Sequence, residues 1–321
     1  MTTPPGLAAR ALCAAADEAL TEASFRTADF SAADRLFTEA RDLAAVDGDR
    51  DGEALAITGL GMTRHGRNIA RLVDGVALSE ADVTAEEELM RGALAAWRET
   101  GDAAGTARAL FGLSLVFRAL RRDWDSAMPY LWQAFGLAEA VEESGDLYAA
   151  SEIHRHVGFY YLYQDVRPAE AVRRLRHSLA LRERLGDSRR LPSALVALGQ
   201  ADLAAGEPRR AAASLYRAVE LARAGGLLPW RIRDAEQTLA EAEAAIGATA
   251  ELGQRGSRVG SAGGGGQVCG PEPRVEFPER GLAITWNGCR TFISPRGVRM
   301  GERGTPVWRR ARNRTLCRTH V

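Results

Sequence analysis

The chain has 321 residues, a formal net charge of zero and a hydrophobic fraction of 46%. This length can bury one or two domains or a single array of repeats. All 42 basic residues are Arg, and charged residues interrupt the apolar runs. We therefore expect neither export nor a membrane span, and we predict a cytoplasmic protein.

Charge and glycine are distributed unevenly along the chain. Residues 250–321 contain 13 Arg against 5 Glu and hold 13 of the 33 Gly, so this segment is basic and residues 1–249 are acidic. Such a composition cannot bury a core and is typical of disorder. We therefore predict a helical domain over residues 1–249 and a disordered tail over residues 250–321. The sequence leaves open whether this tail is native or the product of a frameshift.

The four cysteines have no spacing that is typical of a zinc site, and three of them lie in the tail. We interpret all four as free thiols in a reducing compartment. They are Cys13, Cys269, Cys289 and Cys317.

Residues 6–246 alternate between amphipathic stretches rich in Ala and Leu and short breaks that contain Gly. The breaks are Gly48-Asp49, Gly101-Asp102, Gly145-Asp146, Gly186-Asp187 and Gly225-Gly226. Glycine ends a helix because it adopts the left-handed conformation without steric cost, and the following Asp can cap the next helix. The breaks recur at intervals of 53, 44, 41 and 39 residues, which is the period of stacked helical hairpins.

Each interval predicts a first helix, a short turn and a second helix. The clearest is residues 187–226, where Gly199 in the first helix allows close approach of a neighbour and Pro208 begins the second helix. Ser31 with Asp34 and Thr84 with Glu87 resemble capping boxes. The interval between Ile69 and Val83 indicates a longer first helix or an extended turn. Residues 229–246 predict a closing helix.

These intervals resemble the tetratricopeptide repeat family. Its pattern of a large apolar residue followed by Gly in the first helix matches Leu60-Gly61, Phe111-Gly112, Val157-Gly158 and Leu198-Gly199. Its small-large-small series in the second helix matches Ala33/Phe37/Ala40, Glu86/Met90/Ala93, Ala127/Leu131/Ala134, Ala171/Leu175/Ser178 and Ala211/Leu215/Ala218. Glu86 and Ser178 depart from the pattern, and the intervals are longer than usual. The long form is similar to repeats of large bacterial transcriptional regulators, of actinobacterial type.

The resemblance implies an all-α, right-handed α-solenoid of about five hairpins plus a C-terminal capping helix. It also implies that the first helices line a concave groove that binds peptides. Residues 152–165 concentrate aromatic and charged side chains in one such helix, which suits capture of a peptide segment. The groove residues expected from this register are Met62, His65, Leu113, Phe117, Glu152, Arg155, Phe159, Leu162 and Tyr163.

Other clusters have simpler interpretations. His154 and His156 are two residues apart, so on a helix they point to opposite faces and cannot bind one metal ion. Trp124, together with the aromatic residues that follow it, is typical of core packing. The run of Arg from Arg173 to Arg184 predicts a solvated outer face of a second helix.

Motifs for nucleophilic catalysis, phosphate binding and metalloprotease chemistry do not occur in the sequence. We therefore expect a non-catalytic scaffold or adaptor that binds a protein or peptide partner, with no cofactor and no metal. One alternative is a sensor or regulatory module that acts through a partner. Another is a nucleic-acid-associated protein that uses the Arg-rich tail, although we do not favour nucleic acid as a partner. The sequence does not specify the oligomeric state.

Overall fold

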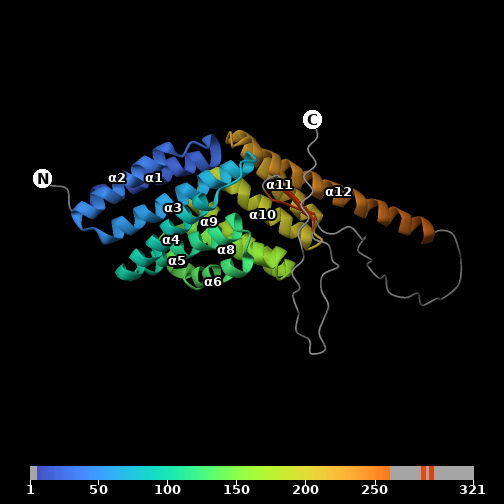
Figure 1. Ribbon diagram of the computed structural model, residues 1–321. Coiled ribbons are helices and arrows are strands. Elements are labelled where there is room, and N and C mark those ends of the chain that lie inside the picture. The colour runs from blue at the N-terminus through green and yellow to red at the C-terminus, as the bar shows by residue number, and fades with distance from the viewer. Residues whose placement is uncertain (1–5, 261–282, 287–288, 293–321) are drawn as a thin grey trace, which may run out of the picture. The chain divides into compact units, whose positions relative to one another are not determined.

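The computed structural model describes residues 6–260, 283–286 and 289–292 (Figure 1). The chain divides into two compact units, residues 1–261 and residues 262–321. Every described element of the first unit is helical, which confirms the predicted all-α class. The expected disorder of residues 250–321 falls largely outside the described residues.

Helices of the first unit pack in consecutive pairs joined by short turns, as in a helical-repeat protein (Figure 1). Two short segments are π-helical, residues 23–27 and 116–120, and residues 188–190 form a 3-10 turn. The elements are α1 (Leu7–Glu22), η1 (Ala23–Thr27), α2 (Ser31–Asp47), α3 (Arg50–Val73), α4 (Glu80–Thr100), α5 (Ala103–Leu115), η2 (Val116–Leu120), α6 (Trp124–Gly136), α7 (Ala138–Glu143), α8 (Leu147–Tyr163), α9 (Pro168–Leu185), η3 (Ser188–Arg190), α10 (Leu191–Ala204), α11 (Pro208–Ala224) and α12 (Pro229–Gly260).

The Gly-Asp breaks have the predicted local structure. Gly48, Gly101, Gly145 and Gly186 all have positive φ, between 69° and 86°. Each following Asp is the N-cap of the next helical element, and its carboxylate accepts a hydrogen bond from a backbone amide of the first turn. The glycine therefore ends one helix and the Asp begins the next. The glycine allows the last carbonyl groups of the first helix to be satisfied, and the Asp satisfies the first amide groups of the second.

Two helix starts differ from the prediction. The helix expected to begin near Thr84 begins at Glu80, where Ser79 and Asp82 form the capping box. Ser31 lies inside α2 and makes no cap, because the N-cap position belongs to Phe30. Ser79 with Asp82 has the same residue types and spacing as Ser31 with Asp34, so the pattern alone does not distinguish the pair that forms the capping box.

Two helices are longer than their neighbours. Helix α3 has 24 residues and extends to Val73, which accounts for the extra length of the second interval. Helix α12 continues past residue 249, where we expected the domain to end, and reaches Gly260.

Glycines in the first helices lie against large side chains of the second helices. A Cβ atom on Gly158 would lie 2.7 Å from Leu175 Cγ, and one on Gly199 would lie 2.6 Å from Leu215 Cγ. Both separations are shorter than a van der Waals contact, so α8 packs on α9, and α10 on α11, only without a side chain there. All fifteen second-helix positions selected from the sequence are at most 1% exposed.

The beginning of the first unit lies against its end, where α1 and η1 meet the start of α12 (Figure 1). The amide of Leu228 donates to the carbonyl of Phe25 at 2.8 Å, and Arg231 Nε donates to the carbonyl of Ser24 at 3.0 Å. Arg189 in η3 forms ion pairs with Glu18, on α1, at 2.6 Å. The succession of hairpins therefore turns back on itself.

Residues 103–120 form the one described stretch that is long and apolar enough to cross a membrane. Most of it, 61%, is buried inside the first unit as α5 and η2. Leu113, in its centre, is fully buried in the largest hydrophobic cluster, as in the core helix of a folded domain.

The second unit is described only in two short strands, β1 (Ala283–Trp286) and β2 (Cys289–Phe292). They pair in antiparallel register, with Ala283 opposite Phe292 and Trp286 opposite Cys289.

Candidate functional site

Helix α8 carries the face on which the sequence predicts binding. Tyr148, Glu152, Arg155, Phe159 and Tyr163 follow one another at spacings of three or four residues, so they lie along one side of the helix. Glu152 and Phe159 are buried, whereas the other three side chains keep partial exposure. Of the five groove residues predicted on this helix, Glu152, Arg155, Phe159 and Tyr163 lie on this face, whereas Leu162 does not and Tyr148 was not predicted.

Arg155 is held rigidly on this face. It donates two hydrogen bonds to the carboxylate of Glu152, at 3.0 and 2.7 Å, and its guanidinium lies over the ring of Phe159 at 5.1 Å. The Tyr163 hydroxyl donates to Gln200 Oε1 of α10 at 3.1 Å. These bonds fix both side chains in position, which lowers the entropy cost of binding a ligand.

Tyr148 lies at the other end of the face, close to two guanidinium groups. Arg190 Cζ lies 3.7 Å from the centroid of the Tyr148 ring, and Arg182 Cζ lies 5.4 Å from it. Arg190 also donates to Asp187 Oδ2 at 3.0 Å and to the hydroxyl of Thr21 on α1. Elements far apart in the sequence thus surround one phenol ring.

The sequence assigns Arg182 to a solvated outer face, and this prediction is wrong. The Arg182 side chain is 1% exposed, and it points from α9 toward α8 and α10. It contacts Glu152 and donates to Ser151 Oγ at 3.1 Å, to Ser193 Oγ at 2.6 Å and to the carbonyl of Arg190 at 2.6 Å. The charge is buried because this set of acceptors satisfies it.

Two further arginines approach the same face from η2 and α12. Burial, together with the neighbouring charge of Arg155, lowers the pKa of Arg118 to about 9. Burial likewise lowers the pKa of Arg231 to about 10, with Arg155 and Arg182 contributing in the same direction. We use the term inner cluster for Arg118, Arg155, Arg182, Arg190 and Arg231 together with Tyr148 and Tyr163.

The inner cluster is electropositive. Burial acts to raise the pKa of Tyr148, but the charges of Arg190, Arg182, Arg155 and Arg231 outweigh it and hold that pKa below its usual value. A phenol responds in this way only where positive charge exceeds negative charge nearby.

Two carboxylates face the cluster from the elements that meet at the ends of the unit. Asp17 lies on α1 and Asp234 on α12. Burial raises the pKa of each to about 6, although Arg190 acts against this shift at Asp17 and Arg231 at Asp234. Both side chains nevertheless keep exposed surface.

The other predicted groove residues lie away from this cluster or beneath it. Leu113 is fully buried in the core, and Leu162 packs in the cluster between α8 and α10. Phe117 stacks on Tyr130 with ring centroids 5.5 Å apart. Met62 packs against the core with partial exposure.

The side chain of His65 interacts with the buried carboxylate of Glu86. Its Nδ1 lies 2.8 Å from Glu86 Oε1, while Asn68 donates to the other carboxylate oxygen at 2.8 Å. This network explains why Glu86 stands where the repeat pattern has Ala, since the carboxylate has two partners on α3.

Tyr148 and most of the arginines of the inner cluster were not among the residues predicted from the sequence. Extending the helical spacing of Glu152 and Arg155 back by one turn would have found Tyr148. Arg231 could not be found in this way, because it reaches the cluster only through the meeting of α12 with η1.

A separate group of potential metal ligands lies between α7, α8 and α9. Glu142, His154 and His177 each offer one ligand atom, and these atoms lie within 4.8 Å of one another. His156 points elsewhere and packs edge-on against Phe111, so the two histidines of the His-x-His pair face opposite ways, as predicted.

A shallow depression of about 740 Å³ lies over α2 and α3. Its lining carries charges of both signs, and Arg67 pairs with Asp34 across it at 3.4 Å. This depression has no aromatic lining and does not include any residue of the predicted groove.

No protein-family model and no curated protein matches the chain. Among solved structures, the chain is similar to BtubC (BKLC) from P. vanneervenii, with 21% identity over 71% of this chain and 95% of that chain, at a TM-score of 0.40. A TM-score this low assigns neither fold nor function.

Proposed function

We propose that this chain is a non-catalytic binding protein that holds an acidic segment of a partner protein against the inner cluster. The observation that carries the proposal is the gathering of five arginines from η2, α8, α9, η3 and α12 around two tyrosines. In this proposal the first unit is a right-handed α-solenoid of about five hairpins of tetratricopeptide-repeat type, closed by α12.

The repeated local chemistry supports the solenoid form. Each Gly-Asp break pairs a left-handed glycine with an N-capping Asp, and the first-helix glycines lie against large residues of the second helices. In a solenoid each hairpin buries its apolar face on its neighbours, which leaves the faces of the first helices available for a ligand.

Charge balance supports an acidic ligand. Glu152 forms ion pairs with Arg155 and Arg182, and Asp187 forms one with Arg190. Asp17 and Asp234 also face the cluster, which makes four carboxylates. Five guanidinium groups therefore exceed the negative charge around them. Guanidinium groups bind carboxylates through paired hydrogen bonds, so Asp or Glu side chains of a partner would compensate the excess.

The residue types also support protein recognition. Arg and Tyr dominate binding energy at protein interfaces because they combine large contact area with directional hydrogen bonds. Arg155 and Tyr163 are partly exposed and already fixed by Glu152 and Gln200, so little ordering is required when a partner binds.

A binding measurement with charged peptides tests the proposal. We would measure fluorescence anisotropy with a labelled Glu-rich peptide and with its Gln-for-Glu counterpart. Wild-type protein should prefer the Glu-rich peptide, and added salt should weaken its binding. The double variant Arg155→Ala with Tyr163→Ala should lose about tenfold or more in affinity, which is about 1.4 kcal/mol.

The matched control is Arg173→Ala with Tyr216→Ala, which removes the same residue types from the exposed faces of α9 and α11. This variant should bind like wild type, and circular dichroism should show that both variants are folded. Equal affinity of all three proteins for the Glu-rich peptide would contradict the proposal.

A further inference from the structure

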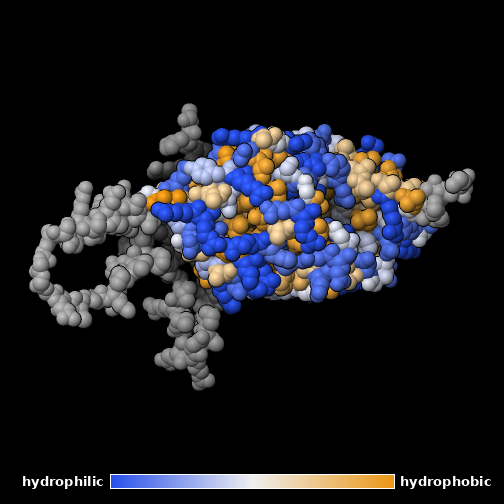
Figure 2. Space-filling model, turned by 180° about the vertical axis from the view of Figure 1, so that it is seen from behind, coloured by the Kyte–Doolittle hydropathy of each residue, from blue (hydrophilic) through white to orange (hydrophobic). Residues whose placement is uncertain are grey.

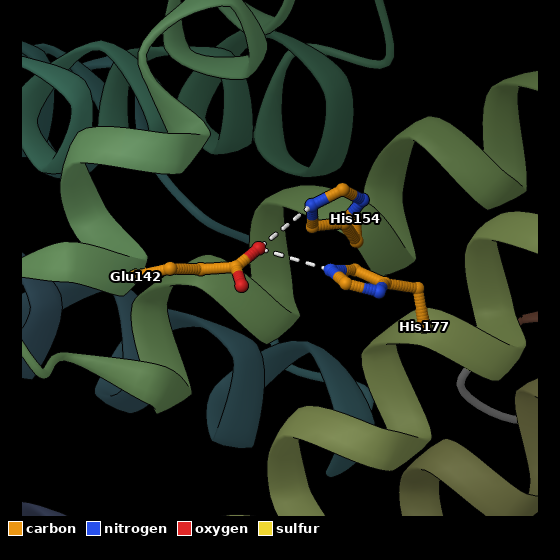
Figure 3. A group of neighbouring side chains, drawn as sticks. All are labelled: Glu142, His154 and His177. Atoms are coloured by element: carbon orange, nitrogen blue, oxygen red, sulfur yellow. Dashed lines mark hydrogen bonds and ion pairs between the residues drawn. The ribbon is translucent and has the colours of Figure 1, made fainter.

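Three helices bring Glu142, His154 and His177 together (Figure 3). His177 Nε2 lies 2.9 Å from Glu142 Oε1, and His154 Nε2 lies 3.5 Å from the same oxygen. The side chains come from the end of α7, the middle of α8 and the middle of α9. The two imidazoles thus point their Nε2 atoms at one carboxylate.

We propose that Glu142, His154 and His177 form a binding site for a divalent transition-metal ion, with Zn²⁺ as the best fit. Two His nitrogens and one carboxylate oxygen are a ligand set that zinc uses when it keeps its fourth position open. This site is independent of the inner cluster and of the function proposed above.

The distances suit such an ion. Zinc lies about 2.0–2.2 Å from His and carboxylate ligands, so tetrahedral ligand atoms are about 3.3 Å apart. The two separations to Glu142 Oε1, 2.9 and 3.5 Å, lie on either side of this value. Since all three ligand atoms are within 4.8 Å of one another, small side-chain rotations complete the geometry.

The surroundings orient the ligands and leave a way in. His154 is buried, and its ring packs edge-on against Phe135 at 5.4 Å and against His177 at 4.3 Å. His154 Nδ1 is buried without a hydrogen-bond partner, so Nε2 is the nitrogen placed for an interaction. Glu142 and His177 are partly or fully exposed, which gives an ion and its fourth ligand, a water molecule, access from solvent.

One neighbouring charge opposes the ion. Arg174 lies over Phe135, with Cζ 4.6 Å from the ring centroid, and Phe135 packs against His154. A guanidinium this close repels a cation. Removing that charge should therefore strengthen metal binding. If Glu142, His154 and His177 only form hydrogen bonds with one another and bind no ion, the same change should not alter metal binding.

The test uses the full chain after treatment with a chelator. Titration with Co²⁺, followed by visible absorption, should give the spectrum of a four-coordinate ion with one equivalent bound, and Zn²⁺ should displace it. Affinity should fall at least tenfold in His177→Ala and in Glu142→Gln. Arg174→Gln should bind more tightly than wild type.

Two controls separate this site from adventitious binding. Replacing Cys269, Cys289 and Cys317 with Ser should leave the Co²⁺ spectrum and affinity unchanged, because those thiols are outside the proposed site. Zn²⁺ should raise the melting temperature of wild type but not that of His177→Ala, since only the protein that binds the ion is stabilised by it. The proposal is overturned if wild type binds no ion or if His177→Ala binds as tightly as wild type.

Discussion

The amide nitrogen of Leu228 lies 2.8 Å from the carbonyl oxygen of Phe25. Arg26 Nε donates to the carbonyl of Gly225 at 2.8 Å, across 199 residues of sequence. These bonds join η1, in the first hairpin, to the segment that leads into α12. Because of this closure, residues of both ends face α8, and the inner cluster contains side chains that an open array would keep apart. Figure 2 shows the opposite side of the molecule from Figure 1, where hydrophobic and hydrophilic residues are mixed.

The contact between η1 and the start of α12 predicts that Phe25 is important for the stability of the folded protein. Its side chain is 3% exposed and packs with Ala222, Leu227 and Ile232. Phe25→Ala should lower the free energy of unfolding by about 3 kcal/mol, and hydrogen exchange at the Leu228 amide should accelerate. Val46→Ala, on the exposed side of α2, is the control and should have little effect. Unchanged exchange at Leu228 in Phe25→Ala would argue against closure.

Replacement of glycine by alanine should change the free energy of unfolding in opposite directions at Gly158 and Gly92. Gly158→Ala places a methyl group against Leu175 and should destabilise the protein by about 1–3 kcal/mol. Gly92 lies inside α4, where an added Cβ atom would have no neighbour within 4 Å, so Gly92→Ala should stabilise the protein by about 0.5–1 kcal/mol. Urea unfolding measures both. A stabilising Gly158→Ala would contradict the close packing of α8 on α9.

The buried acid on α4 should be stabilising despite its charge. Glu86 is fully buried and accepts from Asn68 on α3. Glu86→Ala, which restores the residue of the repeat pattern, should lower the free energy of unfolding by about 1–3 kcal/mol because a buried amide loses its partner. In the double variant with Asn68→Ala, the loss should be smaller than the sum of the two single losses. A gain in stability for Glu86→Ala would show that burying the carboxylate costs more than its hydrogen bonds return.

The raised pKa of Asp17 predicts that the stability of the folded protein depends on pH. Its pKa is about 6 in the folded protein, above the value of about 4 in an unfolded chain. The folded state therefore binds more protons between these values, and the contribution of Asp17 to stability is lost as pH rises through this window. Asp17→Asn should melt at a higher temperature than wild type at neutral pH, and the difference should shrink as the pH is lowered. Asp42→Asn, exposed on α2, is the control; the same shrinking difference there would contradict this assignment to Asp17.

Local chemistry made much of the fold predictable. Gly186 and Asp187 specify a helix end and a helix start through their own backbone and side chain, and both have the predicted conformations. The second-helix series was predictable because burial of Leu175 and Leu215 repeats at the helical period. The start of α4 was less predictable, because Ser79 with Asp82 has the same residue types and spacing as Ser31 with Asp34, and only the first pair forms a capping box.

Long-range contacts were not predictable from the same signals. Arg182 stands in a run of arginines that reads as a solvated face, yet its partners Ser151 and Ser193 belong to other helices. His154 and His177 are 23 positions apart, and only the packing of α8 on α9 brings them to Glu142. Such groupings depend on how hairpins stack, which no local pattern specifies.

The most direct test of the account is to locate a bound acidic peptide. A Glu-rich peptide that carries a photoreactive group would be cross-linked to the full chain, and the attachment sites identified by mass spectrometry. We predict attachment to the inner faces of α8 and α12, near Tyr163 and Asp234, and loss of these products with the Gln-for-Glu peptide. Attachment mainly to the outer faces of α2 or α11 would contradict the claim that the inner cluster is the binding site.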